Sequence, residues 1–340
     1  MSQPEPTLPP PALLTNLLGG KMVTHALGTF ADLRVADHLA EGPRSASELA
    51  PLVGAQPDAL YRVCRALGMF GVLVEHEGQC FSLTPVGALL RSDVPGSMRD
   101  MAVFWGQGWH SSAWGGLTHA VKTGEPGFPA VHGASVWQWL ATHAEPAAVF
   151  DRAMTSFSSM VAQAVVDAYD FTRFARVADI GGGHGALLAA LIAGSSAQGV
   201  LFDRPEVVAG AAALLAGHAS ASRIEIVGGD FFAGVPDGCD AYVLKHVVHD
   251  WNDEASVRIL RHCAAGLRPG GRVLLVEMVV PPIGEPSFAK LLDLEMLVVA
   301  DAGKERTEAE FGALLAQAGL RLTRVVPTAS PVFVIEAERT

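Results

Sequence analysis

A glycine-rich turn between an apolar strand and an Ala/Leu-rich helix constrains this chain most. Residues 176–192 read RVADIGGGHGALLAALI, so glycines occupy 181–183 and 185. Read loosely, 181–186 satisfies the dinucleotide fingerprint G-x-G-x-x-G/A, which is typical of nicotinamide and flavin enzymes. The turn therefore predicts a nucleotide-like cofactor, and the rest of the sequence must indicate which one.

Short apolar strands alternate with helical segments from about residue 170 onward. The strands predicted in this region are RVADI (176–180), GVLFD (199–203), IEIVGGD (224–230), CDAYVLK (239–245) and GGRVLLVEMVV (270–280). This alternation predicts a doubly wound, Rossmann-like α/β sheet over residues 169–340. The last two apolar runs, 320–328 and 330–339, have no helix between them. We therefore expect the last strand to run antiparallel to the others.

The N-terminal part predicts a mostly helical winged-helix domain over residues 12–100. Apolar residues at helical spacing from Val23 to Ala36 form a stripe, and Ser45 with Glu48 makes a capping box that opens a second helix. A third helix is entered through Pro57, and the alternation around Glu77-Gly78 predicts a β-hairpin.

Charge argues against nucleic acid as a partner of this domain. The formal net charge of the chain is −11, and Arg62 and Arg65 are offset by the neighbouring acids Asp58, Glu75 and Glu77. A DNA-reading winged helix presents basic residues to the major groove.

Because the stripe from Val23 to Ala36 has no evident partner within its own domain, we expect this domain to build a homodimer.

Four further features of the sequence concern its N-terminal residues, membrane spans, cysteines and the segment between the two domains. Five prolines in the first eleven residues predict a disordered lead-in over 1–11, and no stretch of about 18 apolar residues predicts a membrane span. Four scattered cysteines fit reduced thiols and a cytoplasmic location. A helical linker over 101–168 holds five of the six tryptophans, either as an interdomain core or as a pocket for a flat ligand.

Acidic residues follow three successive strands and narrow the choice of cofactor. Asp203 lies 22 residues after Gly181, where an acid hydrogen-bonds a ribose diol of either a nicotinamide or an adenosyl cofactor. Asp179, just ahead of the glycines, suits a cationic ligand better than a pyrophosphate, which favours a helix N-terminus. Asp230 is placed to take an adenine amino group, and Phe231 to pack on the ring. Each acid alone could equally cap a strand end.

Taken together, these motifs resemble the S-adenosylmethionine-dependent O-methyltransferases of the caffeate, acetylserotonin and microbial polyketide-tailoring type. The resemblance runs nearly end to end and includes DIGGGHG, FDRPEVV, GGDFF, LKHVVHDWND, LRPGGRVLLVEMVVP and GKERTEAEF. It implies S-adenosylmethionine as cofactor, S-adenosylhomocysteine as product, and a winged-helix dimerisation domain. The cofactor-binding residues that it implies are Arg152, Asp179, Gly181, Gly183, Asp203, Asp230, Phe231 and Lys245.

The segment LKHVVHDWND holds the candidate base. His246 and His249 share a helix face and suit a metal pair, but no third ligand of suitable spacing is evident in the sequence. A satisfied structural histidine is the other plain alternative. The resemblance instead implies that His249 is a general base flanked by Glu277 and Glu305, with no metal.

The sequence indicates only the chemical class of the molecule that accepts the methyl group. The resemblance implies a planar phenolic substrate, such as an aromatic secondary metabolite, in a pocket lined by Phe104, Trp105, Phe150, Met154, Asp293 and Met296. Two alternatives stay open at this point. Some relatives on this scaffold bind the cofactor but act as decarboxylases or hydroxylases, and the glycine turn alone would permit an NAD-dependent oxidoreductase.

Overall fold

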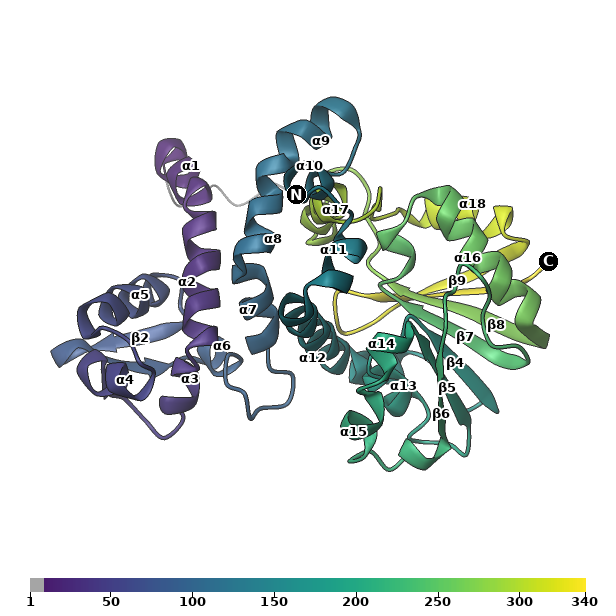
Figure 1. Ribbon diagram of the computed structural model, residues 1–340, viewed down its shortest axis with the longest axis horizontal. Coiled ribbons are helices and arrows are strands. Elements are labelled where there is room, and N and C mark those ends of the chain that lie inside the picture. The colour runs from purple at the N-terminus through teal and green to yellow at the C-terminus, as the bar shows by residue number, and fades with distance from the viewer. Residues whose placement is uncertain (1–8) are drawn as a thin grey trace. The chain divides into compact units, whose positions relative to one another are not determined.

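The computed structural model describes residues 9–340 and separates into two compact units. The first unit ends at Ser111, and the second spans Ser112–Thr340 (Figure 1). Most of the predicted lead-in, residues 1–8, lies outside the described residues, and helix α1 already begins at Pro10. The division at Ser111 falls inside the predicted linker, so the boundaries at residues 100 and 168 stay predictions.

The first unit is helical with one small sheet. Its helices are α1 (Pro10–Leu18), α2 (Gly20–Asp32), α3 (Val35–His38), α4 (Ala46–Leu52), α5 (Pro57–Met69), α6 (Pro85–Ala88) and α7 (Arg99–Gly106). The antiparallel sheet has the order β1 (Arg44–Ser45), β3 (Cys80–Leu83), β2 (Leu73–His76). This arrangement confirms the predicted winged-helix domain.

Hydrogen bonds and backbone preferences of single residues determine where these helices begin and where the chain turns. Ser45 accepts the backbone N–H of Glu48 while the Glu48 carboxylate accepts that of Ser45, which completes the predicted capping box. Pro57 occupies the first turn of α5, where its missing N–H costs nothing. Gly78 adopts φ 73° between β2 and β3, a left-handed conformation that a glycine takes without strain.

The predicted apolar stripe on α2 is largely covered within its own unit, which corrects the sequence-based expectation. Phe30 and Ala36 are fully buried, and Leu27 and Leu33 pack against the same core. The stripe finds partners because α5 and α7 both pack on α2. A run of exposed apolar side chains lies instead on α1 and the start of α2; its members are Leu13, Leu14, Leu17, Leu18 and Met22.

The second unit is built on a seven-stranded sheet. Its strands are β4 (Arg176–Ile180), β5 (Gln198–Asp203), β6 (Ile224–Gly228), β7 (Cys239–Lys245), β8 (Leu267–Glu277), β9 (Leu320–Pro327) and β10 (Phe333–Arg339). The order across the sheet is β6-β5-β4-β7-β8-β10-β9, and β4 to β8 are parallel. Strand β10 pairs antiparallel with both β8 and β9, which confirms the predicted antiparallel last strand.

Helices cover both faces of this sheet. The helices of the second unit are α9 (Leu117–Thr123), α10 (Gly127–His132), α11 (Val136–Thr142), α12 (Ala144–Ala168), α13 (Ala186–Leu191), α14 (Pro205–Val208), α15 (Ala211–Leu215), α16 (Asp253–Gly266), α17 (Ala289–Val299) and α18 (Glu308–Gln317), with α8 (Gly108–Ala113) at the division. Val177 belongs to the core against α12 and α13, whereas its neighbour Ala178 belongs to the core against α16 and α18. Because successive strand residues face opposite sides, the fold is doubly wound as predicted.

The sheet brings the predicted cofactor residues to one edge. Asp179, Asp203 and Lys245 lie at the carboxyl ends of β4, β5 and β7, and Asp230 lies two residues beyond β6. Ligands of open α/β sheets bind at this edge. No helix within residues 9–340 is long and apolar enough to cross a membrane.

Candidate active site

The glycine turn after β4 is shaped by hydrogen bonds to the next strand. Gly181 and Gly183 have φ values of 69° and 58°, and their N–H groups donate to Phe202 O and to Asp203 Oδ2, each at 2.8 Å. A Cβ on Gly181 would lie 2.7 Å from Val247 Cγ2. A Cβ on Gly183 would meet no other described atom within 4 Å, so this part of the turn borders open space. The backbone there forms a cradle that a ligand can approach closely.

Asp203 holds the turn and faces the same edge. Its carboxylate accepts the N–H of Gly183 and that of Arg204 at 2.8 and 2.7 Å. Burial raises the pKa of Asp203, and these two backbone donors oppose that rise. Because each carboxylate oxygen has two lone pairs, both oxygens can still accept hydroxyl groups of a ligand.

Asp179 places a buried negative charge beneath the glycines. A Cβ on Gly182 would lie 2.8 Å from Asp179 Oδ2, and that oxygen has no hydrogen-bond partner among residues 9–340. Burial raises the pKa of Asp179 to about 7, while the charge of Lys245 lowers it. The Lys245 ammonium lies 5.8 Å from the ring of Phe157, and burial lowers the pKa of Lys245. A buried acid with one unpartnered oxygen beside a glycine cradle fits a cationic, amino-bearing cofactor.

Asp230 and Phe231 lie at the same edge. Asp230 is exposed, and its Oδ1 accepts the N–H of Phe232 at 2.8 Å. Phe231 is 3.9 Å from the position of a Cβ on Gly181, and its ring meets that of Trp251 edge-on at 6.0 Å. The structure therefore brings Phe231 next to the turn, which sequence spacing alone could not establish.

Arg152 is placed less favourably than predicted. It is exposed on α12, whereas its neighbour Asp151 is partly buried and interacts electrostatically with His184 and Asp203. His184, inside the glycine turn, also hydrogen-bonds Thr155 of α12 at 2.9 Å through its Nδ1. In this turn of α12, Asp151 and Thr155 are thus the side chains directed toward the glycine turn. The role predicted for Arg152 stays a prediction.

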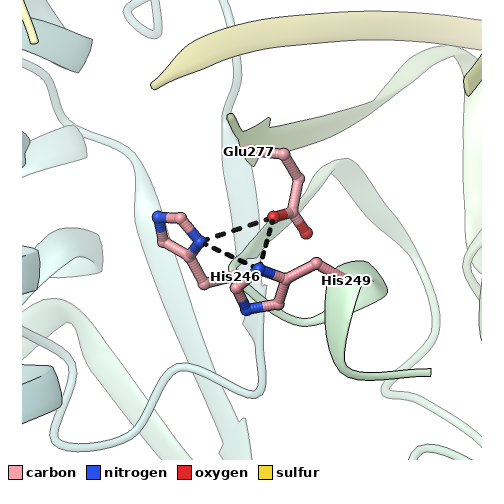
Figure 2. Close-up of side chains that lie close together, drawn as sticks. All are labelled: His246, His249 and Glu277. Atoms are coloured by element: carbon pink, nitrogen blue, oxygen red, sulfur yellow. Dashed lines mark hydrogen bonds and ion pairs between the residues drawn. The ribbon is translucent and has the colours of Figure 1, made fainter. Parts of the chain in front are cut away.

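His249 lies in a buried group of acids. It sits in the single 3₁₀ turn η4 (Val248–Asp250), and its Nδ1 is 2.6 Å from Glu305 Oε1 and 3.8 Å from Glu277 Oε2. Both glutamates are buried, and Glu277 Oε1 accepts the N–H groups of Val247 and Val248. Figure 2 shows His246, His249 and Glu277 converging. The three predicted catalytic residues are therefore brought together.

The contact with Glu305 fixes how the imidazole can act. A carboxylate at 2.6 Å from Nδ1 requires the proton on that nitrogen, because a carboxylate only accepts. When the ring is neutral, Nε2 therefore carries the lone pair. Nε2 lies 3.5 Å from Asp250 Oδ1, which is longer than a good hydrogen bond. The side chain can take up one proton at Nε2.

Electrostatics favour the charged form of His249. Burial disfavours the imidazolium, but the charges of Glu277, Glu305 and Asp250 outweigh it and raise the pKa of His249 to about 10. Burial likewise raises the pKa of Glu277 to about 7 and that of Asp250 to about 6. His246 has the opposite shift: burial and the charges of His249 and Lys245 lower its pKa well below 6.5.

The same cluster contains a candidate third metal-ligand atom. His246 Nδ1, His249 Nδ1 and Glu277 Oε2 lie within 4.8 Å of one another, and the position of Glu277 in the sequence did not make this third atom evident. However, His249 Nδ1 is hydrogen-bonded to Glu305 at 2.6 Å and would have to lose that proton to bind an ion.

The six residues predicted to line the acceptor pocket divide between the two units. Phe104 and Trp105 belong to α7 of the first unit. Phe150 and Met154 lie on α12, and Asp293 and Met296 lie on α17, all in the second unit. Asp293 Oδ1 accepts the N–H of Glu305 at 2.9 Å, which ties α17 to the segment that contacts His249.

Sequence reasoning did not predict the placement of two side chains around His249. Asp250 is the charged group next to His249 Nε2, and Arg306 is completely buried beneath the 3₁₀ turn. Asp250 was visible as the neighbour of His249, although its orientation was not. Nothing in the sequence distinguished Arg306 from a solvated arginine.

Comparison with known proteins defines the family. Residues 114–321 match the O-methyltransferase domain, and residues 15–93 match the O-methyltransferase dimerisation domain. The chain is 43% identical over 331 residues to phenazine O-methyltransferase PhzM of Lysobacter antibioticus, covering 97% of this chain and 96% of that protein. The crystal structure of LaPhzM superposes with a TM-score of 0.92 at 42% identity, covering 98% of this chain and 100% of that one. The chain belongs to the S-adenosylmethionine-dependent O-methyltransferase family.

Other relatives bear on cofactor and chemistry. The neocarzinostatin-pathway O-methyltransferase NcsB1 was solved with S-adenosylhomocysteine and 1,4-dihydroxy-2-naphthoic acid, and it superposes with a TM-score of 0.76 at 34% identity, covering 93% of this chain and 96% of that one. Aclacinomycin 10-hydroxylase RdmB of Streptomyces purpurascens is 33% identical, covering 94% of this chain and 86% of that protein. Family membership establishes the methyltransferase scaffold, and the site must decide the chemistry performed on it.

The electrostatics of the cluster predict an unusual titration of His249. Nuclear magnetic resonance of the ring should show it protonated through neutral pH, with a pKa near 10. Replacing Glu305 with Gln removes a negative charge next to Nδ1 and should lower that pKa. A wild-type His249 that titrates near the ordinary value of about 6.5 would contradict this description of the cluster.

Proposed function

We propose that this enzyme methylates a phenolic hydroxyl of a small aromatic secondary metabolite, with His249 as the general base. The observation that carries the proposal is the 2.6 Å contact between His249 Nδ1 and Glu305, because it leaves Nε2 as the only proton acceptor of the ring. Glu277 and Glu305 stabilise the imidazolium that forms when the acceptor loses its proton. We take this arrangement to favour hydroxyl methylation over the decarboxylase and hydroxylase alternatives.

The glycine cradle and the edge of the sheet would hold the cofactor. We assign Gly181, Gly183 and Asp179 to its amino-acid portion, Asp203 to its ribose, Asp230 and Phe231 to its adenine, and Lys245 to a position nearby. When bound, S-adenosylmethionine supplies a methyl group that leaves its sulfur, which keeps the electron pair, and bonds to the acceptor oxygen. The proton of that hydroxyl goes to His249 Nε2.

The class of acceptor follows from relatives and from base strength. PhzM acts on a phenazine by name, and NcsB1 was solved with a naphthoic acid. A phenol has a pKa of about 10 and a free imidazole about 6.5, so proton transfer to an unassisted histidine would be uphill by about 5 kcal/mol. The raised pKa of His249 closes most of that gap. A screen of phenols, naphthols and hydroxyphenazines for methylated products would identify an acceptor for the assays below.

Cofactor binding should depend on Asp203. Calorimetry should detect S-adenosylhomocysteine binding by the wild type and none of NAD. Asp203→Ala should weaken that binding by about 1.5–3 kcal/mol, the usual contribution of a hydrogen bond to a charged group. The exposed Asp170 provides the matched control, and Asp170→Ala should bind as the wild type does. Tight NAD binding, or an Asp203→Ala variant with full affinity, would exclude this assignment.

Catalysis should depend on His249. Because general-base catalysis typically contributes a factor of about 10²–10⁴, His249→Ala should lose that much kcat while S-adenosylhomocysteine affinity stays nearly unchanged. His218 is exposed, and His218→Ala should retain full activity. EDTA should leave the wild-type rate unchanged. If His249→Ala keeps more than about a tenth of kcat, positioning rather than proton removal drives the reaction.

We also propose that the enzyme is a cytoplasmic homodimer. Five exposed apolar side chains lie on α1 and the start of α2, from Leu13 to Met22, and three of them, Leu17, Leu18 and Met22, fall within residues 15–93, which match the dimerisation domain. Such a patch is typical of an interface. Sedimentation should therefore find a dimer at micromolar concentration, and Leu17→Glu with Leu18→Glu should shift it toward monomer. A stable wild-type monomer would contradict the proposal.

A further inference from the structure

The segment that supplies Glu305 also runs beside the backbone of the base. The N–H of Lys304 donates to His249 O at 2.9 Å, and Asp301 forms a parallel bridge with Trp251. The approach is close, because a Cβ on Gly303 would lie 2.3 Å from His249 O. The backbone of residues 301–306 therefore runs directly alongside the backbone of the turn that carries His249.

Arg306 ends this segment with a fully buried guanidinium under the turn. Its Nη1 donates to Val248 O and its Nη2 to Trp251 O, both at 2.9 Å. Nε and Nη2 also donate to Asp253 Oδ1, at 3.1 and 2.8 Å. One side chain thus binds the carbonyl before His249, a carbonyl two residues after it, and the first residue of α16.

These contacts matter because a short turn depends on bonds from outside it. Residues 248–250 form a single 3₁₀ turn, and the Ser256 hydroxyl donates to the same two carbonyls, Val248 O and Trp251 O, that Arg306 binds. Arginine offers five N–H donors in a planar fork, so it can bind two carbonyls and a carboxylate at once. A lysine ammonium has three donors around one nitrogen and cannot span the same groups.

Adjacent residues of the 301–306 segment thus reach two parts of His249. Glu305 holds the imidazole through Nδ1, and Arg306 holds the main chain on both sides of it. We propose that Arg306 is a positioning residue that keeps the His249 ring against Glu305 and aimed at the acceptor. This inference rests on the proposed role of His249, but the placement of the ring can be tested without it.

The test compares Arg306→Lys and Arg306→Met with Arg261→Lys as control. Arg261 also donates to a backbone carbonyl, Gln317 O at 3.1 Å, but it is exposed. A ring displaced by about 1 Å costs about 100-fold, so kcat should fall by that order in both Arg306 variants. S-adenosylhomocysteine affinity should stay within about twofold, and Arg306→Lys should retain more activity than Arg306→Met. Arg261→Lys should match the wild type.

Two further measurements separate positioning from simple loss of stability. The His249 titration should move toward ordinary values in the Arg306 variants, because the ring leaves Glu305, whether or not His249 is the base. In a His249→Ala background, Arg306→Lys should cost no further activity. The inference is overturned if the Arg306 variants keep the wild-type His249 titration, or if Arg306→Lys lowers kcat equally with and without His249. If His249→Ala keeps most of its activity while the other results are as expected, only the proposed role of His249 as general base is overturned.

Discussion

The hydrogen bond between His249 Nδ1 and Glu305 is the interaction on which the chemistry of this site depends. Both groups are buried, so each charge is stabilised chiefly by the other, and Glu277 adds a second negative charge beside the imidazolium. Removing one partner of such a pair would leave an uncompensated buried charge, which is far more costly than losing a surface ion pair. The same contact sets the tautomer, contributes to the raised pKa of the imidazole and leaves Nε2, 3.5 Å from Asp250 Oδ1, as the nitrogen that can take up a proton.

The fold makes this pairing possible by ending several chain segments at one place. Strand β7 leads into the turn of His249, β8 ends at Glu277, and the segment before α18 supplies Glu305 and Arg306. On the neighbouring strands, β4 and β5 end at the glycine turn and at Asp203, whose carboxylate holds that turn. The sheet therefore brings the proposed base and the proposed cofactor cradle to the same edge without long loops.

How much of this was predictable depends on the range of the interaction. The strands, the glycine turn, the capping box at Ser45 and the antiparallel last strand are local patterns, and all are confirmed. The pairing of His249 with Glu277 and Glu305 came from family resemblance alone, since no local pattern joins positions 28 and 56 residues apart. The stripe on α2 was misjudged because its cover comes from α5 and α7. Arg306 went unnoticed because burial of a charged side chain depends on tertiary contacts.

The pH dependence of kcat/KM in the wild type and in Glu305→Gln tests the account most directly. If His249 is the proposed base, its neutral imidazole is the active form, and because carboxylates raise its pKa, the wild-type rate should climb into the alkaline range. Removing one carboxylate lowers that pKa, so the rise in Glu305→Gln should begin at lower pH. Using the same acceptor in both assays cancels the ionisation of the acceptor itself. Superimposable profiles for the two enzymes would contradict the claim that Glu305 controls a catalytic histidine.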